Sequence, residues 1–435
     1  MVVISLYNLV DALWVAKLGH QAMAVLTIIM PFFIIFIAIG AGTGIGVNAL
    51  ASRRFGERNV EDANKVTGQT FFLCLLLGII FLLATNLFPR QILLISGATP
   101  DILDLGVQYI TVLGWSMPLF FFGTVSRNIF QASGDAMRPM IFVVIAQGIN
   151  IVLDPCFIFG WGFFPEMGIA GAAMATVIAV SIGSLLALWY IFSGRTVYNI
   201  QFHHCLPNPV IIWQIYRVGL PSMFMEMTES VGFALFNHVA GAFGSIVLAA
   251  VGIAGRVADL AFMIIIGTAH GLLPIIGFSL GAKQWKRLWE SVRLASTWLV
   301  GFLIGATAIL QIFTPQIISF FNSDPALLAI AVPGMRIFCS TMVIIGPTII
   351  FITTFQGLSK GTDAMVLSLC RQFIFFIPGL FLFSHFWGLT GVWIAMPVSD
   401  ILGFVIAGFW LLREYRLQGR NSVLAESSRF KNPVN

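Results

Sequence analysis

The chain has 435 residues, of which 58% are hydrophobic and only 9% are charged, with a net charge of +5. Soluble domains contain roughly 25% charged residues, so this composition excludes a soluble enzyme, a nucleic-acid-binding protein and a disordered chain. Because the apolar runs are continuous rather than alternating, they also exclude a β-barrel and predict an all-α, polytopic membrane protein.

About twelve apolar runs follow one another along the chain, and a membrane-spanning helix needs about 20 apolar residues. The first run starts at Met1 with no polar lead-in, so we expect its helix to be truncated. The predicted spans are 1–17, 22–51, 66–88, 103–131, 139–161, 168–193, 210–243, 246–280, 289–318, 329–358, 364–386 and 389–412.

Basic residues gather in alternate joining segments and in the tail. All but four of the 23 Lys and Arg residues lie there, Arg127 and Arg371 among them. Cytoplasmic loops carry the excess of Lys and Arg in membrane proteins. We therefore predict that these segments and both termini are cytoplasmic and that the protein lies in the inner cell membrane.

The sequence contains an internal repeat. When the chain is shifted by 225 residues, 19–56 aligns with 244–281 without a gap, and both copies end in Gly before a basic loop. Later, MGIAGAAMAT at 167–176 corresponds to WGLTGVWIAM at 387–396. The repeat predicts two six-helix lobes related by a pseudo-two-fold axis along the membrane normal.

The repeat also predicts domain boundaries. We expect an amino-terminal lobe at 1–195, an inter-lobe loop at 196–209, a carboxyl-terminal lobe at 210–417 and a tail at 418–435. In folds of this kind the substrate site lies between repeats near the middle of the membrane.

Acids inside membrane spans are rare and functional by default. Asp154 follows Asn150 by one helical turn, so both side chains share a face, and Pro155 removes a backbone donor from the same helix. A carboxylate, an amide oxygen and a free carbonyl would bind a proton or a cation. Asp11 is a second candidate, and the alternative is that both acids serve helix packing alone.

Two further sets of residues are weaker candidates. Glu229 follows a proline in the seventh span and is a secondary acid candidate, unless it lies in solvent near the cytoplasmic end. His203, His204 and Cys205 are adjacent in a predicted loop, and with no further ligand nearby they predict no metal site. The chain contains no phosphate-binding loop motif, so it has no ATP motor of its own.

Several segments, in this order and spacing, resemble the multidrug and toxic compound extrusion (MATE) family. The resemblance covers nearly the whole chain. It is carried by SLYNLVDALWVAKLG, ASRRFGERNVEDA, FQASGDAMRP, NIVLDPCFIFGWG, MGIAGAAMAT, VGLPSMFMEMTESVGFALFN and GFSLGAKQWKR.

The resemblance implies a secondary transporter, not an enzyme, that exports amphipathic and often cationic drugs in exchange for Na⁺ or H⁺. It implies no cofactor beyond that ion, small-molecule and lipid-bilayer partners, no nucleic acid, and a monomer. The family's coupling residues in one branch match Asp11, Asn150, Asp154 and Thr176, and the helix-seven acid of another branch matches Glu229. That branch's helix-ten acid has no counterpart here, which favours the amino-terminal site.

Two other functions compete with drug export. A flippase for lipids or lipid-linked oligosaccharides would share the fold, but it would need more basic residues in its cavity to hold pyrophosphate. An intramembrane aspartyl protease would use Asp11 and Asp154 as a dyad, but the chain lacks the Gly-rich motif of such enzymes.

Overall fold

A computed structural model describes residues 11, 13–15, 17–162, 164–321 and 324–431, with side chains described as far as residue 418. These residues form helices and connecting turns, with no strand among them. Their contacts divide the chain into two units, Met1–Met227 and Thr228–Asn435. Most of the predicted first span lies outside the described residues.

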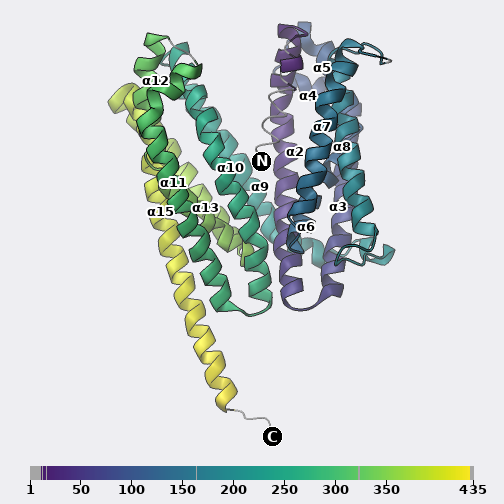
Figure 1. The fold of residues 1–435 in the computed structure, drawn as a ribbon, viewed down its shortest axis with the longest axis vertical. Coiled ribbons are helices and arrows are strands. Elements are labelled where there is room, and N and C mark those ends of the chain that lie inside the picture. Colours follow the sequence, from purple (N-terminus) through teal and green to yellow (C-terminus); the bar gives the residue numbers. More distant parts are fainter. Residues whose placement is uncertain (1–10, 12, 16, 163, 322–323, 432–435) are drawn as a thin grey trace. The chain divides into compact units, whose positions relative to one another are not determined.

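The first unit is built from antiparallel helices joined by short turns (Figure 1). After α8 the chain forms a short 3₁₀ helix, η1, and enters α9. The elements are α2 (His20–Gly56), α3 (Val60–Leu87), α4 (Pro89–Ile95), α5 (Pro100–Gly114), α6 (Met117–Ala132), α7 (Met137–Phe159), α8 (Ile169–Phe192), η1 (Phe202–Cys205) and α9 (Pro209–Gly241).

The second unit starts inside α9 and contains one stretch of π-helix, η2. Its last helix, α15, is broken at Gly388, where φ is 56°. The elements are α10 (Ser245–Gly281), α11 (Trp285–Phe321), α12 (Pro325–Cys339), α13 (Met342–Gly357), α14 (Gly361–Leu369), η2 (Cys370–Phe376) and α15 (Ile377–Lys431).

The described helices agree with the predicted membrane spans. Seven are long and apolar enough to cross a membrane, and two bent pairs, α5 with α6 and α12 with α13, bring the number to nine. One of the seven, Gly361–Gln418, covers the predicted eleventh and twelfth spans together. The predicted seventh span corresponds to α9, which carries Arg217, Glu226 and Glu229.

Helix boundaries confirm the internal repeat. The start and end of α10 each lie 225 residues after those of α2, and α12 and α13 have the same spacing from α5 and α6. The two helices of each pair meet at a bend in the same position of the repeat, with bend angles of 59° for α5 and α6 and 43° for α12 and α13. The turn residues Arg58 and Lys283, which are also 225 apart, both have a positive φ.

Aromatic side chains hold the first unit's helices together. Phe36 of α2 is fully buried, and its ring centroid lies 5.0 Å from that of Phe81 on α3 and 5.6 Å from that of Phe121 on α6. These are edge-to-face contacts, which aromatic rings prefer. They fix α2 and α6, two of the helices that line the cavity described below.

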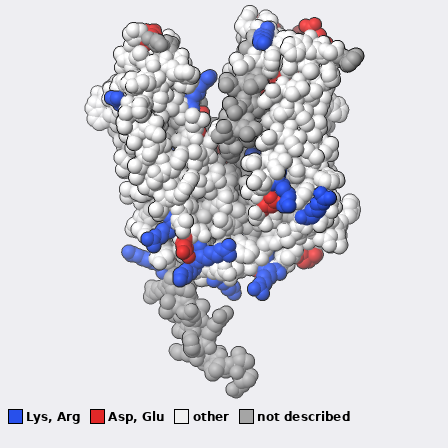
Figure 2. Space-filling view, in the orientation of Figure 1, with Lys and Arg blue, Asp and Glu red and all other residues white. Residues whose placement is uncertain are grey.

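Charged residues are sparse on the surface and unevenly placed. In each unit, most of the Lys and Arg side chains in Figure 2 gather toward the end that carries the turn between its first two long helices. These turns join α2 to α3 and α10 to α11. This distribution is the one that the Lys and Arg pattern of the sequence predicts for the cytoplasmic ends.

Candidate functional site

The site begins with the close approach of α7 and α8. Gly171 of α8 packs directly on the backbone of α7, because a Cβ at this position would overlap the carbonyl oxygen of Phe157. Small residues at helix crossings let membrane helices approach this closely. The approach brings Asn150 of α7, which also contacts Asp154 on the same helix, against Thr176 of α8.

Hydrogen bonds orient this cluster. With the Asn150 amide satisfied at both ends, Nδ2 donates to Asp154 Oδ2 at 2.8 Å and Oδ1 accepts from the Thr176 backbone N–H at 3.1 Å. In the reverse orientation Nδ2 lies 3.3 Å from Thr176 Oγ1, and two acceptor oxygens, of Asn150 and Asp154, face each other. The first orientation is therefore favoured, and it ties α7 to α8.

Asp11 completes the cluster. Its carboxyl group and that of Asp154 lie within hydrogen-bonding reach of each other. Asp154 is fully buried, and its Oδ1 has no donor among the described residues. Because ionised carboxylates only accept hydrogen bonds and like charges repel, a proton or cation between the two acids would satisfy both. The structure thus brings together all four residues that the family resemblance implies.

A cavity of about 740 Å³ lies inside the first unit beside this cluster, with Asp11 and Thr176 among its lining residues. Most of its wall is apolar, including Phe33, Phe120 and Phe142. Its volume falls within the roughly 300–1,000 Å³ of small-molecule sites. The cavity can therefore hold a drug-sized amphipathic molecule next to two carboxyl groups.

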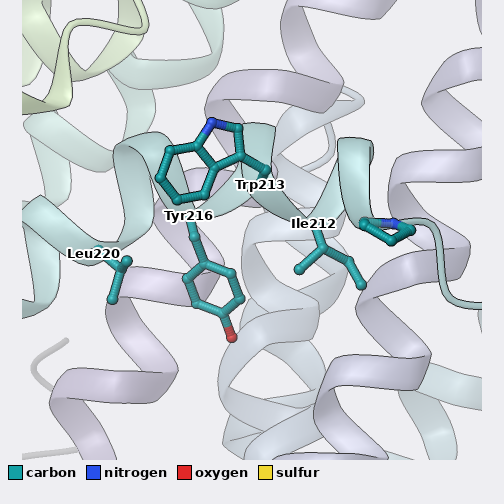
Figure 3. Close-up of a pocket in the computed structure, with 5 residues that line it drawn as sticks. Ile212, Trp213, Tyr216 and Leu220 are labelled. Carbon is teal, nitrogen blue, oxygen red and sulfur yellow. The ribbon is translucent and has the colours of Figure 1, made fainter.

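A second pocket, of about 410 Å³, is lined by residues of α9 alone: Pro209, Ile212, Trp213, Tyr216 and Leu220 (Figure 3). It is open to the surface, and no acid lines it. An open, apolar surface of this kind suits contact with lipid chains. The cavity beside Asp11 has the chemistry that this pocket lacks, so we place the candidate site there.

Glu229, the secondary acid candidate, lies in the second unit in a different environment. Arg371 Nη2 donates to Glu229 Oε1 at 3.3 Å, and Arg371 Nη1 donates to Asp400 Oδ1 at 3.0 Å. Thr341 Oγ1 donates to the other Asp400 oxygen at 3.3 Å. Glu229 thus has a fixed cationic partner within its own unit.

The prediction that Arg371 lies in a cytoplasmic segment is wrong. Arg371 belongs to η2, inside a continuous helical run, and its side chain is only 16% exposed. The buried carboxylate of Asp400 makes this position tolerable, since buried charges need partners. Short π-helical stretches are frequent at functional sites, and this one aims the guanidinium at two acids.

The prediction that no further ligand lies near His203 and His204 is also wrong, because Glu61 of α3 reaches both. The three ligand atoms lie within 4.8 Å of one another. However, the backbone N–H of Gln201 donates to His204 Nδ1 at 3.1 Å, so Nε2 carries the proton and donates to Glu61 at 2.9 Å. This tautomer leaves His204 no lone pair for a metal, so the cluster fastens the segment after α8 to α3.

Arg127 is a functional candidate that sequence reasoning missed. The prediction places it in a cytoplasmic segment, whereas the structure places it in α6, lining the cavity. Gln147 of α7 lines the same cavity, and its Oε1 is buried without a donor among the described residues. Its place in the sequence could have indicated this, because Arg127 lies inside the fourth predicted span, ahead of the polar turn.

Comparisons with known proteins agree with this geometry. The MatE family model matches residues 1–156 and 221–382. The multidrug export protein MepA of Staphylococcus aureus (strain N315) is 24% identical over 421 residues, which is 96% of this chain and 91% of that protein. MepA of Staphylococcus haemolyticus (strain JCSC1435) is 23% identical with the same coverage.

Solved structures give the same result for the fold. An outward-facing multidrug resistance MATE family transporter of the MOP superfamily has a TM-score of 0.90 and 28% identity, covering 97% of this chain and 94% of that one. A crystal structure of MATE in the bent conformation has a TM-score of 0.91 and 27% identity, covering 97% and 93%. The two-lobe, twelve-helix fold is therefore that of these transporters. The chain belongs to the MATE family of membrane transporters.

Proposed function

We propose that this protein is a secondary active multidrug exporter that exchanges amphipathic, often cationic, compounds for Na⁺ or H⁺. The moving parts are the lobes at 1–195 and 210–417, joined by 196–209 and followed by the tail at 418–435. The protein would act as a monomer in the cell membrane. The named relatives, which are multidrug export proteins, support this function.

One observation carries the proposal: the buried acid pair beside a large apolar cavity within one unit. An apolar, aromatic wall binds many amphipathic molecules without a strict pattern of hydrogen bonds. The acids supply what such a wall lacks, which is attraction for a cation. Asp11 lines the cavity, and Asp154 reaches it through Asp11.

The coupling step follows from the donor atoms of the cluster. Asp11, Asp154, the Asn150 amide and the Thr176 hydroxyl present oxygen atoms, which are the ligands that hard cations prefer. The same two carboxyl groups can instead share a proton. In either case an ion neutralises the pair, weakens its attraction for a cationic drug and allows the lobe helices to repack.

The driving force sets a limit on the export. One charge moved across 100 mV is worth about 2.3 kcal/mol, which corresponds to a drug gradient of about fiftyfold at one ion per drug. An ion can shift the equilibrium between the two conformations only by as much as its affinities for them differ. The coupling site must therefore bind the ion more tightly in one conformation than in the other.

Transport in proteoliposomes tests the function. We expect gradient-driven ethidium movement when an inward Na⁺ or H⁺ gradient is imposed separately, and none in liposomes without protein. Movement driven by one ion and not the other identifies the coupling ion. Failure of both gradients, with ethidium still binding to the purified protein, would contradict antiport.

We expect drug and ion to compete for the cluster. Ethidium affinity in detergent should fall as Na⁺ or H⁺ concentration rises, because the ion removes the negative charge that attracts the dye. In Asp11→Asn this response should flatten, since one of the two carboxylates is gone. Fluorescence anisotropy titrations measure both effects, and a wild-type affinity that ignores both ions would rule out this coupling site.

The proposed topology predicts opposite accessibility at two exposed positions. Cysteine at Lys283, in the basic turn between α10 and α11, should be labelled only from the cytoplasm. Cysteine at Asp324, which precedes α12 in a segment without Lys or Arg, should be labelled from outside. A membrane-impermeant maleimide on whole cells, in a background without the native cysteines, measures this. Outside labelling at position 283 would reverse the topology.

One observation favours the flippase alternative. Arg127 places a cation in the cavity, where a lipid phosphate would need one. It is the only base among the described lining residues, whereas a pyrophosphate calls for several. Displacement of a carboxylate dye by phosphatidylglycerol would distinguish a lipid phosphate from a drug carboxylate at Arg127.

A further inference from the structure

Arg127 has no protein partner within the described structure. Its half-buried side chain lines the cavity from α6, five residues before that helix ends, and it forms no hydrogen bond or ion pair with a described residue. Arg138, just beyond the same turn, is different. It pairs with Asp135 at 2.6 Å and lies over the ring of Tyr190.

A guanidinium in this position needs an anion. It stays charged at any physiological pH and offers five N–H donors. Removing such a charge from water without a partner is costly, and buried charges in proteins are normally paired. The planar fork of Arg matches a carboxylate through two parallel hydrogen bonds. An anionic group that enters the cavity would supply the partner that no described residue gives to Arg127.

The rest of the cavity indicates what molecule would carry that group. Phe120 and Phe142 supply apolar surface, and Gln147 supplies an amide whose buried Oε1 has no donor among the residues that the structure describes. Asp11 is the only acid among the described lining residues, as Arg127 is the only base. The cavity thus has an apolar wall and one charge of each sign.

The separation of the two charges follows from helix geometry. Arg127 lies five residues before the end of α6, and Phe142 lies five residues after the start of α7, so the two are at similar depth. Asp154, the partner of Asp11, lies twelve residues further along α7. At 1.5 Å per residue the backbones at these two levels are about 18 Å apart along the helix axis, so the two charges enter the cavity at different depths.

We propose that Arg127 is an anion subsite that binds the carboxylate of a zwitterionic amphiphile whose cationic end faces Asp11. This inference rests on the proposed function, because the cargo must enter this cavity. It assigns a residue to the acid end of a cargo that carries both charges. Arg127 then selects for the acid end of the cargo, while the acid pair couples the other end to the ion.

A matched pair of dyes tests the subsite. A rhodamine with a free benzoate carboxyl is zwitterionic, and its ethyl ester is a cation of nearly the same shape. Binding of both dyes to the purified full-length protein is measured by fluorescence anisotropy. The proteins are the wild type, Arg127→Gln, Arg127→Lys and the control Arg138→Gln, which removes a nearby exposed guanidinium.

We expect Arg127→Gln to weaken binding of the acid dye by about 10- to 100-fold, as for loss of a charged hydrogen bond. The ester should change by less than about twofold. Arg127→Lys should fall between these, because Lys keeps the charge without the planar fork. Arg138→Gln should bind both dyes as the wild type does.

Each other outcome overturns the assignment. Equal weakening of both dyes in Arg127→Gln would mean that Arg127 only supports the fold. If the wild type binds the ester and not the acid, the subsite is wrong while drug export stands, and if it binds neither, both proposals fail. If added phosphatidylglycerol displaces the acid dye at equal concentration, the occupant is a lipid phosphate instead of a drug carboxylate.

Discussion

Replacing Asp154 with Asn abolishes gradient-driven efflux while the protein stays folded; this is the result we expect. The fully buried carboxyl group of Asp154 meets Asn150 on one side and Asp11 on the other. An amide has the same shape and can still hydrogen-bond to Asn150, but it cannot take up a proton or balance a cation. Efflux in proteoliposomes should fall at least about 100-fold, which corresponds to a rise of about 2.8 kcal/mol in the barrier to transport.

Two variants control for this loss. Asp104→Asn removes an exposed acid whose ion pair with Arg90 is at the surface, where such pairs contribute about 1 kcal/mol or less, so it should transport normally. Asp154→Glu keeps a carboxyl group and should retain part of the activity. A monodisperse gel-filtration profile for Asp154→Asn shows that it is folded. Gradient-driven transport by a folded Asp154→Asn at the wild-type rate would exclude this residue from coupling.

The second large effect concerns the contact that assembles the site. Gly171→Ala should lower the unfolding free energy by about 1–3 kcal/mol, because its Cβ would overlap the backbone carbonyl of Phe157. A backbone atom cannot move aside as a flexible side chain can, so α7 and α8 must separate. The response of dye binding to Na⁺ or H⁺ should weaken as well, since Asn150 and Thr176 lie across this contact.

Gly148→Ala is the matched control. It is also a helical glycine, on α7, but a Cβ there meets nothing within 4 Å. Replacing an unhindered helical glycine with alanine is neutral or stabilises by up to about 1 kcal/mol. Thermal unfolding in detergent, followed by tryptophan fluorescence, compares the two variants. Equal unfolding temperatures for both would show that the α7–α8 contact relaxes easily.

The second unit offers an independent repeat of this test. Gly391 of α15, the counterpart of Gly171 in the repeat, packs on the carbonyl of Phe383 in the same way. Gly391→Ala should therefore destabilise the protein, but it should leave the response of dye binding to the ion intact. This difference separates an effect on the coupling site from a general loss of packing.

Much of the fold could be predicted from the sequence, for a physical reason. In a membrane, each helix satisfies its own backbone, so apolar run lengths indicate the spans directly. The aligned glycines at either end of the repeat lie at the turn before each helix and at its last residue, and α10 keeps the 225-residue shift from α2 at both ends. Asn150 and Asp154 share a face because they are one helical turn apart, whereas their grouping with Asp11 and Thr176 is implied by the family resemblance.

The missed residues depend on contacts that one sequence does not contain. Arg371 is tolerated inside a span because Asp400, 29 residues later, pairs with it. His204 meets Glu61, 143 residues earlier, only after the segment following α8 folds back on α3. Which side of α6 faces the cavity depends on the rotation of that helix, so the role of Arg127 required the structure.

The cluster of Arg371 with Glu229 and Asp400 makes the two halves of the repeat differ in how their acidic residues are neutralised. In the first half, no described residue supplies a cation to Asp11 and Asp154, and in the proposed mechanism their neutralising charge arrives from solution and leaves again. In the second half, the cation is covalently part of the chain and stays between its two acids. Because this guanidinium cannot diffuse away, the buried carboxylate of Asp400 keeps its partner whatever ions lie on either side of the membrane. The two halves of the repeat thus differ in the source of the counter-ion. In the proposed mechanism of the first half it is a diffusible ion, and in the second half it is the side chain of Arg371.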